Sequence, residues 1–150
     1  MSKVVHTVAE WRALRSTHQA AGRIIGFVPT MGALHVGHGS LFKAARQECD
    51  IVLASVFVNP TQFDEAIDFD TYPRTLEADL ALMEKAGVDT VFAPSVGEMY
   101  PTGRHYTVEE DALSRELCGA HRPGHFTGVL TVVMKLLQIA GADRAYFGEK

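Results

Sequence analysis

The sequence lacks long apolar runs and a strong charge of either sign, and each absence excludes a class of protein. No apolar stretch approaches the ~20 residues that a membrane-spanning helix needs. Residues 1–15 mix charged with apolar side chains, so a secretory leader is not expected. The net charge of −4 offers no basic footprint for general nucleic-acid binding. We therefore expect neither a membrane nor a nucleic acid as a partner.

Cysteine is also scarce. Cys49 and Cys118 form neither a CxxC pair nor a spacing typical of metal ligands, and isolated thiols of this kind are typical of buried, reduced side chains in a cytoplasmic protein. The hydrophobic share of 47% and the charged share of 21% are those of a globular domain. We predict one domain over residues 1–150, a cytoplasmic location and no metal held by protein side chains.

Apolar strand-like segments alternate with helical patterns along the chain. Strands are predicted over residues 24–28, 51–58, 88–93 and 144–147, and helices over residues 8–20, 40–49, 75–87 and 129–140. Glu77 and Asp79 fall in the first turn of the third helix, where carboxylates interact favourably with the helix dipole. Residues 59–73 and 94–107 are predicted as loops. This alternation predicts an α/β, Rossmann-like fold, in which a parallel sheet carries helices on both faces.

The most informative segment is the glycine-containing turn over residues 29–38, PTMGALHVGH, between the first predicted strand and the next helix. A helix start at the carboxyl edge of a parallel sheet favours phosphate, because backbone N–H groups are free there. His35 and His38 lie three positions apart and can donate hydrogen bonds to phosphate oxygens during attack. A capping or packing role is the alternative, and a closed zinc site lacks a third ligand nearby. The lysine and Ser/Thr of a P-loop are absent.

Other segments hold further candidates, each with a purely structural alternative. Asn59 and Gln62 follow the second strand and could hold a hydroxy acid, although Asn-Pro is also a simple turn signal. Tyr72, in Tyr-Pro-Arg, has the same ambiguity. His125 lies near the start of the last helix. Lys150 follows Gly148 and Glu149, and could hold a phosphate or be an ordinary terminal charge.

Six segments together resemble the pantothenate synthetase family. They are residues 29–38, FVNPTQF at 57–63, YPRT at 72–75, RPGHFTGV at 122–129, KLL at 135–137 and FGEK at 147–150. The His-x-Gly-His signature alone would indicate only the wider nucleotidylyltransferase superfamily. The FVNPTQF and RPGHF runs narrow the resemblance, which extends from about Gly26 to the last residue.

The resemblance implies an ATP- and Mg²⁺-dependent ligase that forms pantoyl adenylate from pantoate and then transfers the pantoyl group to β-alanine. It also implies a homodimer. It makes His38 and His35 catalytic and assigns Gln62, Pro29 and Thr30 to pantoate, with Gln62 also contacting β-alanine. The ATP contacts that it implies are Met31, Gly32, Ala33, Leu34, His35, Val36, Gly37, His38, Gly148, Glu149 and Lys150.

The family pattern continues past the segment that matches Lys150, with more of the ATP loop, a second pantoate-binding glutamine and a small C-terminal domain. We therefore expect residues 1–150 to be a truncated nucleotide-binding domain that folds but does not make pantothenate by itself. Two alternatives remain open. One is a nucleotidylyltransferase for a phosphorylated acceptor, which would require basic residues where this chain has Asn59 and Gln62. The other is a nucleotide-binding domain without catalysis.

Overall fold

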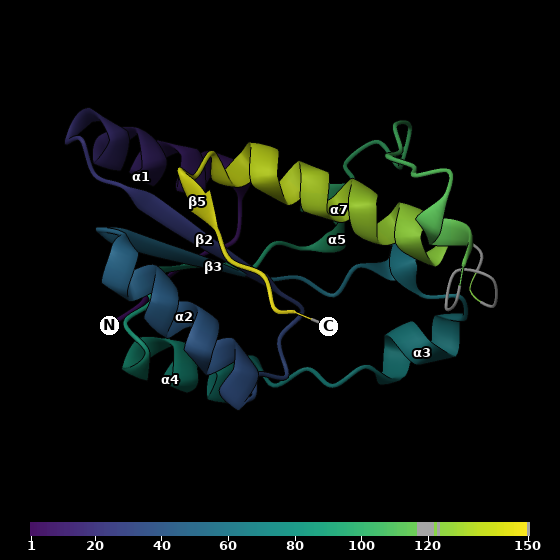
Figure 1. Ribbon diagram of the computed structural model, residues 1–150, viewed down its shortest axis with the longest axis horizontal. Coiled ribbons are helices and arrows are strands. Elements are labelled where there is room, and N and C mark those ends of the chain that lie inside the picture. The colour runs from purple at the N-terminus through teal and green to yellow at the C-terminus, as the bar shows by residue number, and fades with distance from the viewer. Residues whose placement is uncertain (117–121, 123, 150) are drawn as a thin grey trace.

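A parallel sheet forms the centre of the fold (Figure 1). The structure is a computed structural model that describes residues 1–116, 122 and 124–149. Its strands are β1 (Lys3–Val5), β2 (Ile25–Thr30), β3 (Ile51–Val56), β4 (Thr90–Phe92) and β5 (Arg144–Ala145). They pair in the order β1-β4-β3-β2-β5, and every pairing is parallel. The predicted parallel α/β sheet is confirmed. The three-residue edge strand β1 was not predicted, because it is too short to show a periodic pattern.

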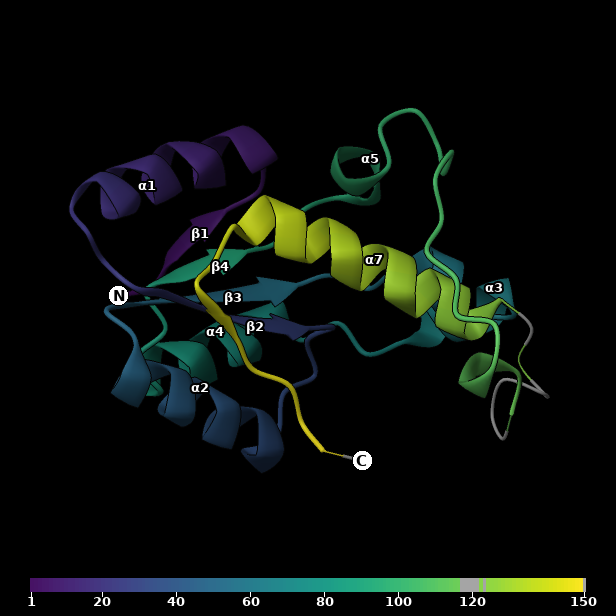
Figure 2. The same cartoon turned by 45° about the horizontal axis from the view of Figure 1, so that its top comes forward.

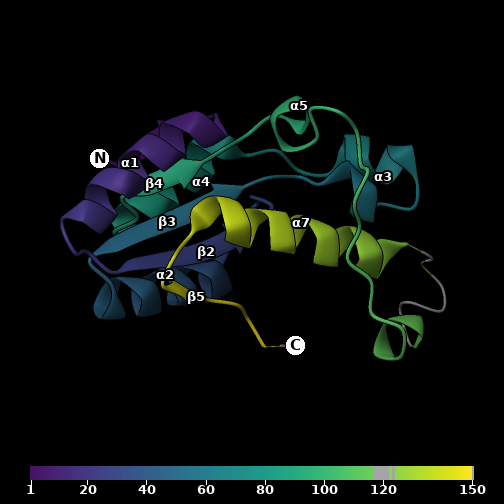
Figure 3. The same cartoon turned by 90° about the horizontal axis from the view of Figure 1, so that it is seen from above.

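Helices cover both faces of the sheet, as predicted. The long ones are α1 (Val8–Ala20), α2 (Val36–Glu48), α4 (Leu76–Lys85) and α7 (His125–Ala140); the short ones are α3 (Ala66–Thr71), α5 (Val96–Met99) and the 3₁₀ turns η1 (Pro60–Gln62) and η2 (Leu113–Arg115). Figures 1 and 2 show α1 and α7 on one face and α2 and α4 on the other. Figure 3 shows α7 extending beyond the carboxyl ends of β2 and β3 toward α3. None of the helices in the described part of the chain is long and apolar enough to cross a membrane.

Two hydrophobic cores, one on each face, hold these layers together. Successive residues of a strand point to opposite faces, so Phe27 belongs to the core under α1 and α7 whereas Val28 belongs to the core over α2 and α4. Trp11 of α1 is fully buried in the first core, and its Nε1 donates to the carbonyl oxygen of Ala140 at 3.1 Å. Each large apolar side chain buried in this way contributes about 1.5–3 kcal/mol. The cores therefore fix the positions of the strands and helices that carry the loops at the carboxyl edge of the sheet.

The strand β2 continues through Pro29 to Thr30, although the sequence predicted that Pro29 would end it. The Phe27 carbonyl accepts from Tyr146 N on the β5 side, whereas the Thr30 carbonyl accepts from Phe57 N on the β3 side. Residues of one strand alternate between these two sides, so the nitrogen of Pro29 faces the β5 side. There β5 pairs only with Gly26 and Phe27. Pro29 thus lies at a local edge, where a missing N–H group leaves no ladder bond unmade.

Two helices begin earlier than predicted. The sequence placed their starts at Ser40 and Val129, because the glycines just before them are poor helix formers, by about 1 kcal/mol each. In the structure α2 begins at Val36 and α7 at His125. Short helices also occur within both predicted loops, as α3 and α5. A cap formed by His35 and His38 supports the early start of α2, and packing of Gly128 against η1 supports that of α7.

Candidate active site

The two histidines of the turn cap the N-terminus of α2. His35 is the N-cap residue, and its Nδ1 accepts from Gly37 N at 3.1 Å; the Nδ1 of His38 accepts from His35 N at 3.2 Å. Their ring centroids lie 4.2 Å apart. A nitrogen that accepts a hydrogen bond carries no hydrogen, so a neutral ring has its hydrogen on Nε2. Each histidine thus caps the helix with one nitrogen and keeps an Nε2–H donor for a ligand.

The surroundings of His38 favour this neutral form. Burial of the half-buried ring lowers the pKa of His38, and the neighbouring His35 lowers it further, while Asp79 acts in the opposite direction. His35 is exposed. A neutral imidazole that donates through Nε2 can stabilise charge that develops on a phosphate oxygen without adding a full charge of its own.

A cavity of about 590 Å³ opens beside His38 at the carboxyl edge of the sheet. One wall comes from the end of β2 and the turn that follows it. A second comes from the segment after β3, which includes Gln62. A third is the apolar face of α7, with residues at helical spacing: Val129, Val132, Val133 and Leu136. The cavity therefore combines an extended apolar surface with a few polar groups, as small-molecule sites do.

The structure brings many of the predicted site residues to this cavity and leaves others outside it. Those that line it are Pro29, Thr30, Met31, Gly32, His38, Gln62, Tyr72 and His125. Outside its wall lie Ala33, Leu34, His35, Val36 and Gly37, which continue the turn into α2, together with Gly148 and Glu149, which are exposed. Lys150 lies outside the described residues.

Gln62, at the end of η1, is held by Asn59 just before η1, by Met31 after β2 and by His125 at the start of α7. The side-chain amide of Asn59, which is 1% exposed, donates to Gln62 Oε1 at 3.4 Å and to the Gly128 carbonyl oxygen at 3.1 Å. Asn59 Oδ1 accepts from the Tyr100 hydroxyl at 3.0 Å. Gln62 Nε2 is left with the thioether sulfur of Met31 at 3.0 Å, a weak acceptor. The amide N–H of Gln62 is thus poised to exchange this sulfur for a ligand oxygen.

His125 supports the same turn from the start of α7. Its Nδ1 lies 2.7 Å from the Gln62 carbonyl oxygen. Since a carbonyl only accepts, Nδ1 carries the hydrogen here, and a neutral His125 leaves Nε2 as an acceptor. Asn59 and His125, whose roles the sequence left open, therefore both hold Gln62 in place.

Several residues of the cavity were not identified from the sequence. They are Phe57, Phe63, Arg122, Phe126, Phe147 and the α7 face. The helical spacing on α7 was visible, but a buried core helix shows the same pattern. Arg122 Nε donates to Asp64 Oδ2 at 3.0 Å, so its positive charge is already paired.

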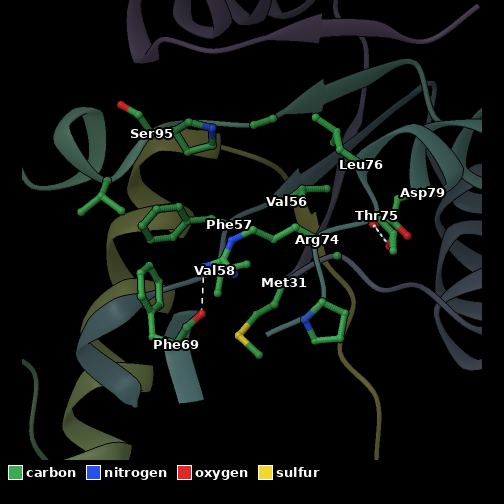
Figure 4. A pocket seen from close by; sticks show the side chains of 15 residues that line it. Met31, Val56, Phe57, Val58, Phe69, Arg74, Thr75, Leu76, Asp79 and Ser95 are labelled. Carbon is green, nitrogen blue, oxygen red and sulfur yellow. Dashed lines mark hydrogen bonds between the residues drawn. The ribbon is translucent and has the colours of Figure 1, made fainter. Parts of the chain in front are cut away.

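A second cavity, of about 310 Å³, shares Met31, Gly32 and Phe57 with the first. Figure 4 shows its lining, which includes the end of β3 and the residues after it (Val56, Phe57 and Val58) and the start of α4 (Thr75, Leu76 and Asp79). The guanidinium of Arg74 borders it and donates to the Phe69 carbonyl oxygen at 2.9 Å. This cavity is mostly apolar. Its lining includes the carboxylate of Asp79, which is bonded to the turn that follows β2.

Comparisons with known proteins identify the family of the chain. A family model described as Pantoate-beta-alanine ligase matches residues 3–150. The chain is 65% identical over 128 residues to pantothenate synthetase from Acidobacterium capsulatum, which covers 85% of this chain and 43% of that protein. It is 53% identical to the Dinoroseobacter shibae enzyme of the same name over 150 residues, which is 100% of this chain and 53% of that protein.

Solved structures give the same result. The crystal structure of pantoate-β-alanine ligase from Francisella tularensis, complexed with βγ-ATP and β-alanine, superimposes with a TM-score of 0.92 at 42% identity, covering 97% of this chain and 56% of that one. Pantothenate synthetase from Thermus thermophilus gives a TM-score of 0.88 at 50% identity, covering 99% and 52%. The chain spans about half the length of the curated relatives it matches.

Proposed function

The chain belongs to the pantoate–β-alanine ligase family, and we propose that it binds ATP and pantoate for the ATP-dependent joining of pantoate to β-alanine. The observation that carries the proposal is that His38 and Gln62 line one cavity, together with the apolar face of α7. One site thus holds a hydrogen-bond donor for phosphate oxygens, on His38, and a hydrogen-bond donor for a hydroxy acid, on Gln62. The βγ-ATP and β-alanine in the Francisella tularensis complex support the same ligands here.

Pantoate is a dihydroxy acid with two methyl groups on one carbon, and the cavity offers a partner for each part. The valines and leucine of α7 would pack against the methyl groups, while the amide N–H of Gln62 would donate to a carboxylate or hydroxyl oxygen. Pro29 and Thr30 would close the wall beside it. Because Asn59 and His125 fix the turn that carries Gln62, its amide needs little reorganisation when pantoate binds.

In the first step a carboxylate oxygen of pantoate attacks the α-phosphorus of ATP. The new O–P bond forms as the bond from the α-phosphorus to the bridging oxygen breaks, so pyrophosphate leaves and pantoyl adenylate remains. The Nε2–H groups of His35 and His38 would donate to the phosphate oxygens as their charge grows. Catalysis of this kind depends on positioning and charge stabilisation and needs no covalent enzyme intermediate.

In the second step the amine of β-alanine attacks the acyl carbon of pantoyl adenylate. The amide bond forms, the acyl–oxygen bond breaks, AMP leaves and the amine loses a proton. Gln62 is our candidate for contact with β-alanine, since it lies where the acyl group would be held. Gly148, Glu149 and Lys150 remain our candidates for further ATP contacts. We propose that Mg²⁺ enters with ATP as its phosphate complex.

The alternative of a phosphorylated acceptor fits this cavity less well. Arg122 is the basic side chain that lines it within the described residues, and its charge is paired with Asp64. The remaining polar groups are amide, hydroxyl and imidazole groups, which suit a hydroxy acid better than a phosphate dianion. The family resemblance further leads us to propose a cytoplasmic homodimer, which light scattering after size-exclusion chromatography would test.

Calorimetric titration tests the proposed function directly. The chain is titrated with MgATP, then with pantoate, and in parallel with pantoate 4-phosphate as the matched phosphorylated ligand. We expect saturable heat from ATP and from pantoate, and weaker binding of the phosphate ester. Pyrophosphate release that depends on pantoate would establish the adenylation step. Tighter binding of the phosphate ester than of pantoate would contradict the proposal and favour a nucleotidylyltransferase.

A further inference from the structure

Asp79 is a buried carboxylate that does not line the main cavity but holds the turn leading to it. Its side chain is 3% exposed at the start of α4. One oxygen, Oδ2, accepts from Ala33 N at 2.9 Å and from the Thr75 hydroxyl at 3.1 Å, and Oδ1 accepts from Leu34 N at 2.9 Å. Figure 4 shows Asp79 beside Thr75, with the hydrogen bond from the Thr75 hydroxyl to Asp79 dashed. The carboxylate therefore binds two successive backbone amides of another segment.

The backbone of that segment needs such an anchor. Gly32 has φ +77°, and Ala33 has φ +50°, which is the left-handed region that is unfavourable for a residue with a Cβ. A Cβ added to Gly32 would lie 3.0 Å from Asp79 Oδ2, so the carboxylate packs directly on the turn. Successive N–H groups in such a conformation form a concave anion site. In this protein the anion bound there is the carboxylate of Asp79.

The turn sets the direction in which His35 and His38 enter the site. Gly32 N is bonded to the Thr30 hydroxyl, and the amides of Ala33 and Leu34 are bonded to Asp79. Each backbone amide over residues 32–34 is therefore already bonded within the protein, and His35 follows at once as the N-cap of α2. Movement of the turn would carry the two imidazoles with it.

We propose that Asp79 is a positioning residue for ATP: by binding the amides of Ala33 and Leu34 it fixes the turn that presents the histidine pair to the phosphates. The ATP part of this proposal rests on the proposed function, whereas the effect on the turn does not. The role differs from the helix-dipole role expected from the sequence. Glu77 lies in the same first turn of α4 but is exposed, and the amides of Ala33 and Leu34 are bonded to Asp79 and not to Glu77.

Three variants separate these roles. Asp79→Asn keeps the size of the side chain, but its amide nitrogen cannot accept, so one donor of the turn loses its partner. Glu77→Gln removes a carboxylate from the same helix end and controls for the dipole. Asp89→Asn controls for general loss of stability, because Asp89 also accepts a backbone amide, from Val52 at 2.8 Å, and an Arg46 bond at 2.7 Å, beside β3 and β4.

Two measurements are made on the 150-residue chain: amide hydrogen exchange at Ala33 and Leu34, followed by NMR, and the affinity for MgATP by calorimetry. For Asp79→Asn we expect hydrogen exchange at one or both amides to become about 10- to 100-fold faster. We expect the affinity for MgATP to fall by a similar factor, because hydrogen bonds to a charged group are lost. Glu77→Gln and Asp89→Asn should stay within about twofold of wild type at these two amides, because neither side chain contacts the turn.

Unchanged exchange at Ala33 and Leu34 in Asp79→Asn would overturn the proposal, as would equal effects of Glu77→Gln. If the wild-type chain binds no ATP, the proposed function fails, and exchange alone decides the role of Asp79. If Asp79→Asn does not fold, Thr75→Val replaces it. That variant removes the donor that shares Oδ2 with Ala33, so exchange should change at Ala33 and not at Leu34; the same change at both amides, or at neither, would contradict the proposed geometry.

Discussion

Gly128 is the position where a single added methyl group should distort the pantoate side of the candidate site. It lies in the first turn of α7, directly against the η1 turn. A Cβ built there would lie 2.4 Å from the Thr61 carbonyl oxygen, 2.7 Å from the Thr61 carbonyl carbon and 2.8 Å from Gln62 Cα. These are backbone atoms, so no side chain can rotate away. The helix and the turn would have to separate by about 1 Å to reach an ordinary contact.

Gly128→Ala is therefore expected to destabilise the fold even though alanine is the better helix former. Overpacking of this kind costs about 1–3 kcal/mol. Separation of α7 from η1 would also stretch the bond from Asn59 to the Gly128 carbonyl and the bond from His125 to the Gln62 carbonyl. We expect a lower free energy of unfolding in urea and a weaker affinity for pantoate, with the larger relative effect on pantoate than on ATP.

Gly39→Ala is the matched control, since it makes the same chemical change inside α2. A Cβ at Gly39 would meet nothing within 4 Å, so the variant should be stabilised by up to about 1 kcal/mol through helix propensity. The two substitutions are thus predicted to have opposite signs. A Gly128→Ala protein within about 0.5 kcal/mol of wild type, with unchanged pantoate affinity, would refute the close contact between α7 and η1.

Two further predictions concern the polar groups of the site. Gln62→Ala should weaken pantoate by about 1–3 kcal/mol and ATP much less, measured by calorimetry with the exposed Gln138→Ala as control; equal weakening of both ligands would remove Gln62 from the pantoate site. The lowered pKa of His38 means that the unfolded chain binds a proton more readily than the folded one. Stability should therefore fall as the pH falls from about 6.5, the usual histidine value, toward the lower folded pKa, and level off below it. Urea unfolding between pH 5 and pH 8 would measure this, and His38→Gln, which cannot titrate, should remove that part of the slope; an identical slope in both proteins would refute the assignment.

The parallel sheet and its two helical layers were predictable, because they depend on patterns that a sequence displays openly. The run Ile51–Val56 carries no charged side chain and is almost entirely apolar, as expected for a strand buried on both faces. The alternation of such runs with amphipathic segments then implies crossovers and a parallel arrangement. By contrast, β1 was missed, since a strand of three residues carries no period, and β5 was predicted over residues 144–147 but pairs only over Arg144–Ala145.

The polar part of the candidate site was predictable only in part. The turn over residues 29–38 and the Asn-Pro turn stand out because each follows a strong strand, where ligands bind in open α/β sheets. The contact of Asp79 with Ala33 and Leu34 joins residues more than forty positions apart, and an acidic residue in the first turn of a helix already has a local explanation. Gly128 likewise looks like a poor helix residue until the η1 backbone is placed against it.

The sequence left a choice between capping and phosphate binding for the histidine pair, and the two roles prove compatible. An imidazole has two nitrogens, and the capping bonds at Gly37 N and His35 N use only Nδ1 of each ring. Capping also requires that Nδ1 carry no hydrogen, which agrees with the lowered pKa of His38. The helix start thus occupies Nδ1 of each ring and leaves Nε2 of each ring free to donate to a ligand. Since Asp79 occupies the amides of the preceding turn, these two donors, and not the turn's backbone, are the groups of this segment best placed to meet a phosphate.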